Sequence, residues 1–169
     1  MKRLIVCIFI LFSFSGLAHK ITIDCEIDPV GDFQITSDSI FGKIIKDIES
    51  STIVANKLQI PLSSFKSGIP LRDEHIHKYL IENKISKNKN IEVFDLKLFL
   101  NEKKRDYAYI YIGTKKQKIF LKKQDQKDFW KIMTKISLKK LKLETPSFMN
   151  ISVKDTLEIS VLLNKKDIR

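Results

Sequence analysis

Four side chains that can do chemistry, Arg72, Asp73, Glu74 and His75, occupy consecutive positions just after a glycine and a proline. An acid–base pair or a nucleophile has to converge with its partners on one pocket. Consecutive residues of a helix instead point about 100° apart, so that Asp73 and Glu74 diverge. The chain also has no GxSxG motif and no nucleophile placed beside a histidine and an acid, which hydrolysis would require. We therefore expect no enzymatic activity and no catalytic residues.

The same stretch does not have the spacing of a metal site, because His75 and His77 are two residues apart. Histidine pairs that bind zinc from a helix are usually four residues apart, since that spacing places both on one face. We expect no metal and no other cofactor. Two interpretations of Arg72, Asp73 and His75 remain. They form a structural motif, in which Arg72 pairs with Asp73 or another acid, or they contact the headgroup of a ligand through Arg72.

This segment also predicts the one helix of the chain, over residues 71–82. Pro70 suits a first helical turn, and Asp73 and Glu74 lie where the helix dipole favours anions. One stripe of this helix carries Leu71, His75, Ile76, Tyr79 and Leu80. We expect this stripe to pack against the rest of the fold.

Elsewhere, apolar and polar residues alternate with a period of two, which is typical of half-buried strands. The clearest such segments are residues 21–27, 58–63, 94–100, 107–112, 116–122, 130–138 and 157–163. Gly113 and Thr114 mark a hairpin turn between two of them. Seven or eight antiparallel strands whose apolar faces must all be covered form a two-sheet sandwich or a barrel, and we favour the barrel.

The first 18 residues have the composition of a signal peptide. Lys2 and Arg3 precede an apolar run over residues 4–14, and small residues follow up to Ala18. We expect cleavage after Ala18, a periplasmic or secreted protein, and one domain over residues 19–169. Cys25 is then the only cysteine, so no disulfide can form within the chain. Its alternation with neighbouring isoleucines predicts a small buried hydrophobe.

The chain is basic, with 31 Lys and Arg against 20 Asp and Glu and a net charge of +11. Cleavage would remove Lys2 and Arg3 and leave a charge of +9. The lysines mostly stand opposite apolar positions of the predicted strands, as on a solvated sheet face. We therefore expect no nucleic-acid binding, and a peripheral contact with an anionic membrane stays open.

Three segments resemble the YceI-like family. Residues 64–80, SFKSGIPLRDEHIHKYL, resemble its corner motif, S-x-x-T/S-G-x-x-x-R-D-x-H. Residues 110–117, IYIGTKKQ, resemble its central hairpin, and residues 146–163, PSFMNISVKDTLEISVLL, resemble its ending. The chain departs from the family where Gln117 replaces the proline of the hairpin and Asn150 replaces a glycine of the ending.

The resemblance implies an all-β fold, a lipocalin-like antiparallel β-barrel of about eight strands with one short helix. Residues 19–169 would form this YceI-like β-barrel domain, and its interior would hold a polyisoprenoid or a similar long-chain lipid without catalysis. The chain would then be an exported carrier or buffer. The inward-facing, lipid-binding candidates are Phe33, Ile35, Phe94, Leu96, Leu98, Ile110, Ile112, Ile119, Leu121, Ile136, Leu138, Ile159 and Val161.

A barrel of about eight strands is at the size where side chains fill the interior or leave room for one small ligand. The alternative is therefore an exported β-barrel with a filled core that acts through its surface, toward a partner protein or an anionic membrane. Tyr107, Tyr109 and Tyr111 are expected on the outer face, where they cover the sheet or form a partner surface. The sequence leaves the identity of the lipid and the oligomeric state, a dimer included, open.

Overall fold

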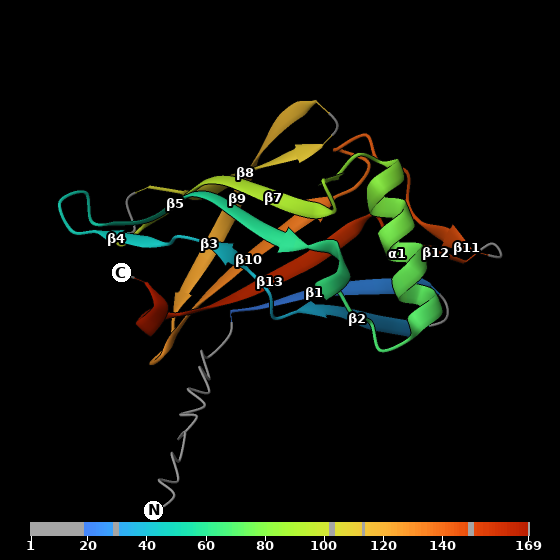
Figure 1. The fold of residues 1–169 in the computed structure, drawn as a ribbon, viewed down its shortest axis with the longest axis horizontal. Coiled ribbons are helices and arrows are strands. Elements are labelled where there is room, and N and C mark those ends of the chain that lie inside the picture. Colours follow the sequence, from blue (N-terminus) through green and yellow to red (C-terminus); the bar gives the residue numbers. More distant parts are fainter. Residues whose placement is uncertain (1–18, 29–30, 102–103, 113, 149–150, 169) are drawn as a thin grey trace, which may run out of the picture.

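The strands form one strongly curved antiparallel sheet, and an α-helix crosses its open side (Figure 1). This computed structural model describes residues 19–28, 31–101, 104–112, 114–148 and 151–168. The expected signal peptide, residues 1–18, lies outside the described residues. The elements are, in chain order, β1 (Lys20–Asp28), β2 (Gly31–Ser37), β3 (Phe41–Gly42), β4 (Ile45–Asp47), β5 (Thr52–Pro61), η1 (Leu62–Ser64), α1 (Pro70–Glu82), β6 (Ser86–Lys87), β7 (Asn90–Phe99), β8 (Asp106–Ile112), β9 (Lys115–Asp125), β10 (Phe129–Ser137), β11 (Ser147–Phe148), β12 (Ile151–Val153), β13 (Thr156–Asn164) and η2 (Lys165–Asp167).

The long strands are those that the alternation predicts, with two differences: β2 is an additional strand, and β5 starts six residues before the predicted segment 58–63. In the described part of the chain, β1, β2, β5, β7, β8, β9, β10 and β13 have seven or more residues each. The sheet order is β11-β12-β1-β13-β10-β9-β8-β7-β5-β3, with β2 beside β1 and β4 beside β5. The all-β, lipocalin-like fold with one helix is thus confirmed, as a sheet curled into a half-barrel (Figure 1).

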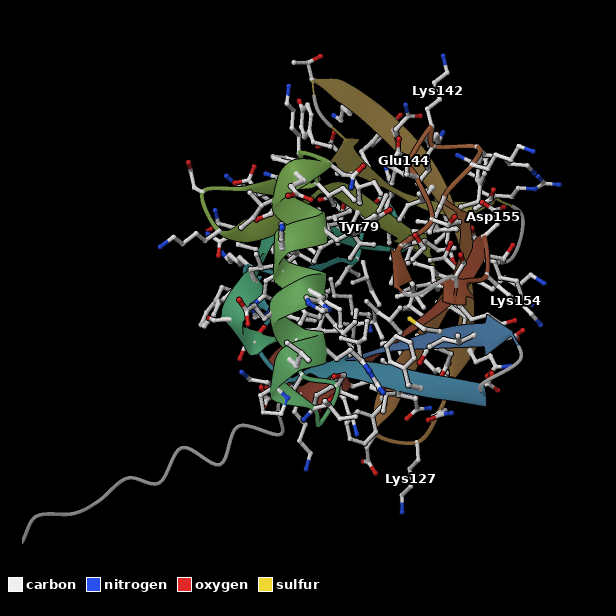
Figure 2. The ribbon with its side chains drawn as sticks, turned by 90° about the vertical axis from the view of Figure 1, so that its right-hand side faces the viewer. Tyr79, Lys127, Lys142, Glu144, Lys154 and Asp155 are labelled. Carbon is white, nitrogen blue, oxygen red and sulfur yellow. The ribbon has the colours of Figure 1, made fainter. Side chains whose placement is uncertain are left out.

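The two ends of the curved sheet meet at an isolated bridge between β2 and the segment that follows β5. The amide of Thr36 donates to the carbonyl of Lys66 at 2.8 Å, and the amide of Lys66 donates back to Thr36 at 2.9 Å. The helix α1 then starts four residues later and runs between β1–β2 on one side and β5–β7 on the other (Figure 2). It therefore covers the side of the half-barrel that the strands leave open.

The expected helix is confirmed, with Pro70 at its first position. At its other end the Asn83 side chain donates to the carbonyl of Tyr79, and Lys84 adopts a left-handed backbone conformation with a φ of 53°. No helix in the described residues is long and apolar enough to cross a bilayer.

The expected packing stripe of this helix is wrong at Leu71, which is 60% exposed, and at His75, which is also exposed. The reason lies in the first turn, where Asp73 accepts hydrogen bonds from the backbone and the hydroxyl of Ser67. These bonds turn the Asp73 side of the helix inward and Leu71 toward solvent. The stripe that packs inward carries Ile76 and Leu80, four residues apart, and Arg72 lies one turn before them.

Two hydrophobic clusters lie inside the half-barrel. The packed-end cluster consists of Ile44, Ile53, Ala55, Leu58, Leu96, Leu98, Ala108, Ile132 and Leu163. The helix-side cluster consists of Ile21, Cys25, Ile35, Ile60, Leu62 and Phe65, and Ile76 and Leu80 of α1 pack against it. The predicted burial of Cys25 is confirmed, and this burial raises the pKa of its thiol to about 11.

Candidate functional site

The apolar interior is unevenly filled along the strands. On β13, which has neighbours on both edges, Leu163 is only 2% exposed, whereas Leu157, Ile159 and Val161 remain partly exposed. These three side chains alternate with the outward-facing ones and pack against the helix-side cluster, so they point inward. A central strand whose inward apolar side chains are still accessible carries apolar surface that the surrounding side chains do not cover. The half-barrel is thus tightly packed around Leu163 and less completely filled around Leu157, Ile159 and Val161, beside the buried residues of the helix-side cluster. We call this part the loosely filled region.

Most of the lipid-binding candidates from the sequence lie along this gradient. Ile35, Leu96, Leu98 and Leu138 are buried, the first in the helix-side cluster and the next two in the packed-end cluster. The candidates that are partly buried against one or both clusters are Phe33, Ile119, Leu121, Ile159 and Val161. Ile110 and Ile136 are also partly buried, and Ile112 is the last residue of β8.

Phe94 does not lie where the alternation places it. Its ring packs at right angles to the ring of Tyr111, 5.0 Å between centroids, and Lys57 lies over it at 5.5 Å. Asp95 has a φ of 48°, and the pairing of β7 with β8 shifts register between Phe94 and Lys97. This bulge reverses the alternation, so Phe94 joins the outer face and Val93 takes the inward position.

Arg72 lies at the edge of the loosely filled region. Its guanidinium sits 4.3 Å from the centroid of the Phe33 ring, and Phe33 packs against the helix-side cluster. The expected salt bridge of Arg72 is not observed among the described residues, because Asp73 turns to Ser67 instead. Arg72 thus presents a cation beside an aromatic ring at the boundary between the interior and solvent.

Asp73 fits the structural interpretation of the charged stretch. Its carboxylate accepts from the Ser67 hydroxyl at 2.6 Å and from the Ser67 amide at 2.7 Å. The hydrogen bond from the Ser67 hydroxyl is the main reason why the pKa of Asp73 lies below its ordinary value. His75 is exposed, so Arg72, Asp73 and His75 do not converge on one point.

An open groove of about 1080 Å³ borders the interior where β1, β2 and β13 meet Ser67, in the segment that precedes α1. The groove reaches Cys25 and Phe33, whose side chains face the interior. Its rim is rich in acidic residues. The charged residues that line it are Asp24, Glu26, Asp32, Lys154, Asp155 and Glu158. Lys154 and Asp155 mark this rim in Figure 2. No three His, Cys, Asp or Glu side chains in the described residues gather in a way that could hold a metal ion.

A hydrogen bond from the second half of α1 attaches the helix across the open side of the half-barrel. The Tyr79 hydroxyl donates to the backbone carbonyl of Glu144 at 2.6 Å, which links α1 to the segment between β10 and β11 (Figure 2). Burial raises the pKa of Tyr79 above its ordinary value, so the hydroxyl keeps the proton that it donates. This link holds the helix over the loosely filled region.

Sequence reasoning missed a charged pair at the packed end. Lys123 and Asp106 lie 3.6 Å apart with both side chains largely buried, and Asp106 also accepts from the amide of Phe99 at 2.6 Å. A signal was present, because Lys123 follows Ile119 and Leu121 at intervals of two and so shares their inward face. The pair closes this end of the interior with polar contacts.

No family model and no curated protein matches this chain. Solved structures do match its fold. BcnA of Burkholderia cenocepacia superposes with a TM-score of 0.61 at 10% identity, over 85% of this chain and 94% of that one. A polyisoprenoid-binding domain from Saccharophagus degradans, implicated in plant cell wall breakdown, superposes with a TM-score of 0.55 at 13% identity, over 85% of this chain and 91% of that one. The chain therefore has the fold that the YceI-like resemblance implied.

Proposed function

We propose that the protein is an exported, non-catalytic carrier or buffer that holds a polyisoprenoid or a similar long-chain amphiphile in its interior. The observation that carries the proposal is the incomplete burial of Leu157, Ile159 and Val161 on a strand with neighbours on both edges. The likeness to a domain described as polyisoprenoid-binding supports the same ligand class. The composition of residues 1–18 supports export.

The energetics of such a site explain why it needs no polar motif. Each buried methylene contributes about 0.8 kcal/mol, so a long hydrocarbon chain has ample driving force. Ordering that chain in the protein offsets part of the gain. Selectivity would then come from the length and shape of the space, with Arg72 beside Phe33 as the polar contact available near its edge.

The direct test is solvent extraction of the purified protein followed by mass spectrometry. We expect a long-chain lipid at close to one molecule per chain. An extract without lipid, together with no uptake of a fluorescent long-chain lipid, would contradict the proposal and favour the alternative of a filled core.

A matched pair of variants shows whether the lipid sits in the interior. Val161 points inward and its neighbour Leu162 points outward on the same strand, so Val161→Phe fills the proposed space while Leu162→Phe adds a ring outside. We expect Val161→Phe to lose the extracted lipid and Leu162→Phe to retain it. Circular dichroism and thermal unfolding check that both variants fold, and equal lipid content in two folded variants would place the ligand elsewhere.

A further inference from the structure

The outer face of β7, β8 and β9 carries an ordered set of aromatic rings and cations. We call it the basic aromatic face. Its members are Lys57, Phe94, Phe99, Arg105, Tyr107, Tyr109, Tyr111, Lys116, Lys118 and Phe120. It lies on the opposite side of these strands from Leu98, Ala108 and Ile119, which face the interior. The face is thus separate from the proposed lipid site.

The cations of this face sit over its rings. Lys118 lies 4.1 Å from the centroid of Tyr107, 5.9 Å from that of Tyr109 and 5.5 Å from that of Phe120. Lys116 lies 4.4 Å from the centroid of Tyr109. Tyr107 and Tyr109 also meet nearly at right angles, 5.8 Å between centroids. These contacts place the lysine ammonium groups in a layer above the aromatic rings of the sheet.

The face combines excess positive charge with exposed apolar surface. Among the described residues, its acids are Asp95 and Glu92, which pair with Lys116 and Lys57. Lys118 and Arg105 form no ion pair in the described part of the chain. The Phe120 ring beside them is 55% exposed. The groove with the acid-rich rim lies at β1, β2 and β13, away from this face in the strand order.

We propose that the basic aromatic face docks onto the surface of an anionic lipid bilayer. Lysine and arginine are attracted to anionic headgroups, and tyrosine and phenylalanine rings favour the depth of the headgroups. A single-stranded nucleic acid fits less well, because its bases need ring faces on which to stack, and Lys116 and Lys118 already cover the faces of Tyr109 and Tyr107. The inference goes beyond the carrier function and does not need the interior to hold a lipid.

Sedimentation with vesicles tests the proposal on the purified protein, with its N-terminus determined by mass spectrometry. We expect binding to vesicles of phosphatidylcholine mixed equally with phosphatidylglycerol, weak binding to phosphatidylcholine alone, and loss of binding in high salt. Lys118→Glu combined with Arg105→Glu should weaken binding to the mixed vesicles by about tenfold or more. Both side chains are on the surface and outside the interior, and the retained fold is checked by thermal unfolding.

A control variant carries the same change in net charge elsewhere. Lys127 in the turn between β9 and β10 and Lys166 in η2 are both exposed, and Lys127 projects into solvent in Figure 2. Lys127→Glu combined with Lys166→Glu should leave vesicle binding within about twofold of the unchanged protein. Equal loss in the two double variants would overturn the proposal, because net charge alone would then explain the binding. Absence of binding to mixed vesicles, or binding to a single-stranded oligonucleotide in its place, would overturn it as well.

A fluorescent label reports which face meets the bilayer. Cys25 is buried and its thiol has a pKa of about 11, so an introduced surface cysteine is labelled selectively once the first 18 residues are removed. An environment-sensitive dye on Phe120→Cys should shift its emission to the blue when mixed vesicles are added. The same dye on Thr156→Cys, at the acidic groove, should not shift. The reverse pattern, or equal shifts at both sites, would contradict the proposed orientation.

Discussion

The two ends of the interior share strands β5, β7 and β13 but differ in how completely these strands are covered. At the packed end, Ile53, Leu98 and Leu163 are at most 2% exposed, and Lys123 and Asp106 close the space. Toward α1, the inward residues of β13 stay partly exposed, and a helix takes the place of strands. The packed end is thus covered by the protein itself, whereas β13 toward α1 exposes apolar surface that a ligand can cover. Substitutions at the two ends should therefore have different consequences.

The largest effect is expected at Leu98, which is fully buried. Leu98→Ala removes methylene groups and leaves a cavity in a densely packed region, so the free energy of unfolding should fall by about 4 kcal/mol. Urea denaturation of the lipid-free protein measures it. A loss below about 1 kcal/mol would mean that this end is loosely packed too, and it would contradict the proposed difference in packing between the two ends.

Asp106→Asn should be the next most damaging change. It leaves the Lys123 ammonium without its acid in a largely buried position, and we expect a loss of about 3 kcal/mol in the free energy of unfolding. Glu158→Gln is the control, because its partner Lys135 is exposed and an exposed ion pair contributes about 0 to 1 kcal/mol. Similar losses in the two variants would show that the packed end does not bury its charges.

At the loosely filled end, Val161→Ala should cost only about 1 kcal/mol in the lipid-free protein, since the side chain is already partly exposed. The same substitution should lower the affinity for a fluorescent long-chain lipid, whereas Leu98→Ala should act on lipid binding only through stability. Denaturation and lipid titration of the two variants, side by side, separate the two regions. An equal loss of stability in the Val161 and Leu98 variants would contradict the difference in packing between the two ends.

The smallest effect concerns the anchoring of α1 by Asp73. Its lowered pKa means that the folded state favours the charged carboxylate, so the stabilisation is present above the unfolded value of about 3.9 and is lost as the pH falls through the folded pKa. Asp73→Asn should therefore lower the free energy of unfolding by about 1 kcal/mol at neutral pH, and the difference should shrink in acid. A difference that is constant with pH would assign the effect to packing rather than to the hydrogen bonds from Ser67.

Much of the fold could be predicted from local pattern. Strict alternation in segments such as residues 157–163 indicated the strands, and Pro70 indicated the start of the helix. The errors arose where a tertiary contact overrides the pattern. Leu71 faces solvent because Asp73 bonds to Ser67, and Phe94 faces outward because the backbone at Asp95 forms a bulge. Neither the hydrogen bond between Asp73 and Ser67 nor the bulge at Asp95 leaves a periodic pattern in the sequence.

The candidate site was harder to predict than the fold. Alternation shows which side of a strand is apolar, but it does not show how much of the enclosed space side chains fill. Arg72 was expected to pair with an acid and instead stacks on Phe33, which is distant in the sequence. Lys123 does not follow the expectation that the lysines lie on a solvated sheet face, because its spacing from Leu121 places it inside. The lipid-binding role of the interior and the signal peptide stay predictions.

The most direct test of the account is to locate a bound chain by NMR. Protein labelled at the methyl groups of isoleucine, leucine and valine would be mixed with a long-chain isoprenoid alcohol, and contacts between ligand methylenes and protein methyls recorded. We expect contacts to Leu157, Ile159 and Val161, and none to Ile53 or Leu98. Contacts confined to outer-face methyls, or no contacts at saturating ligand, would contradict it.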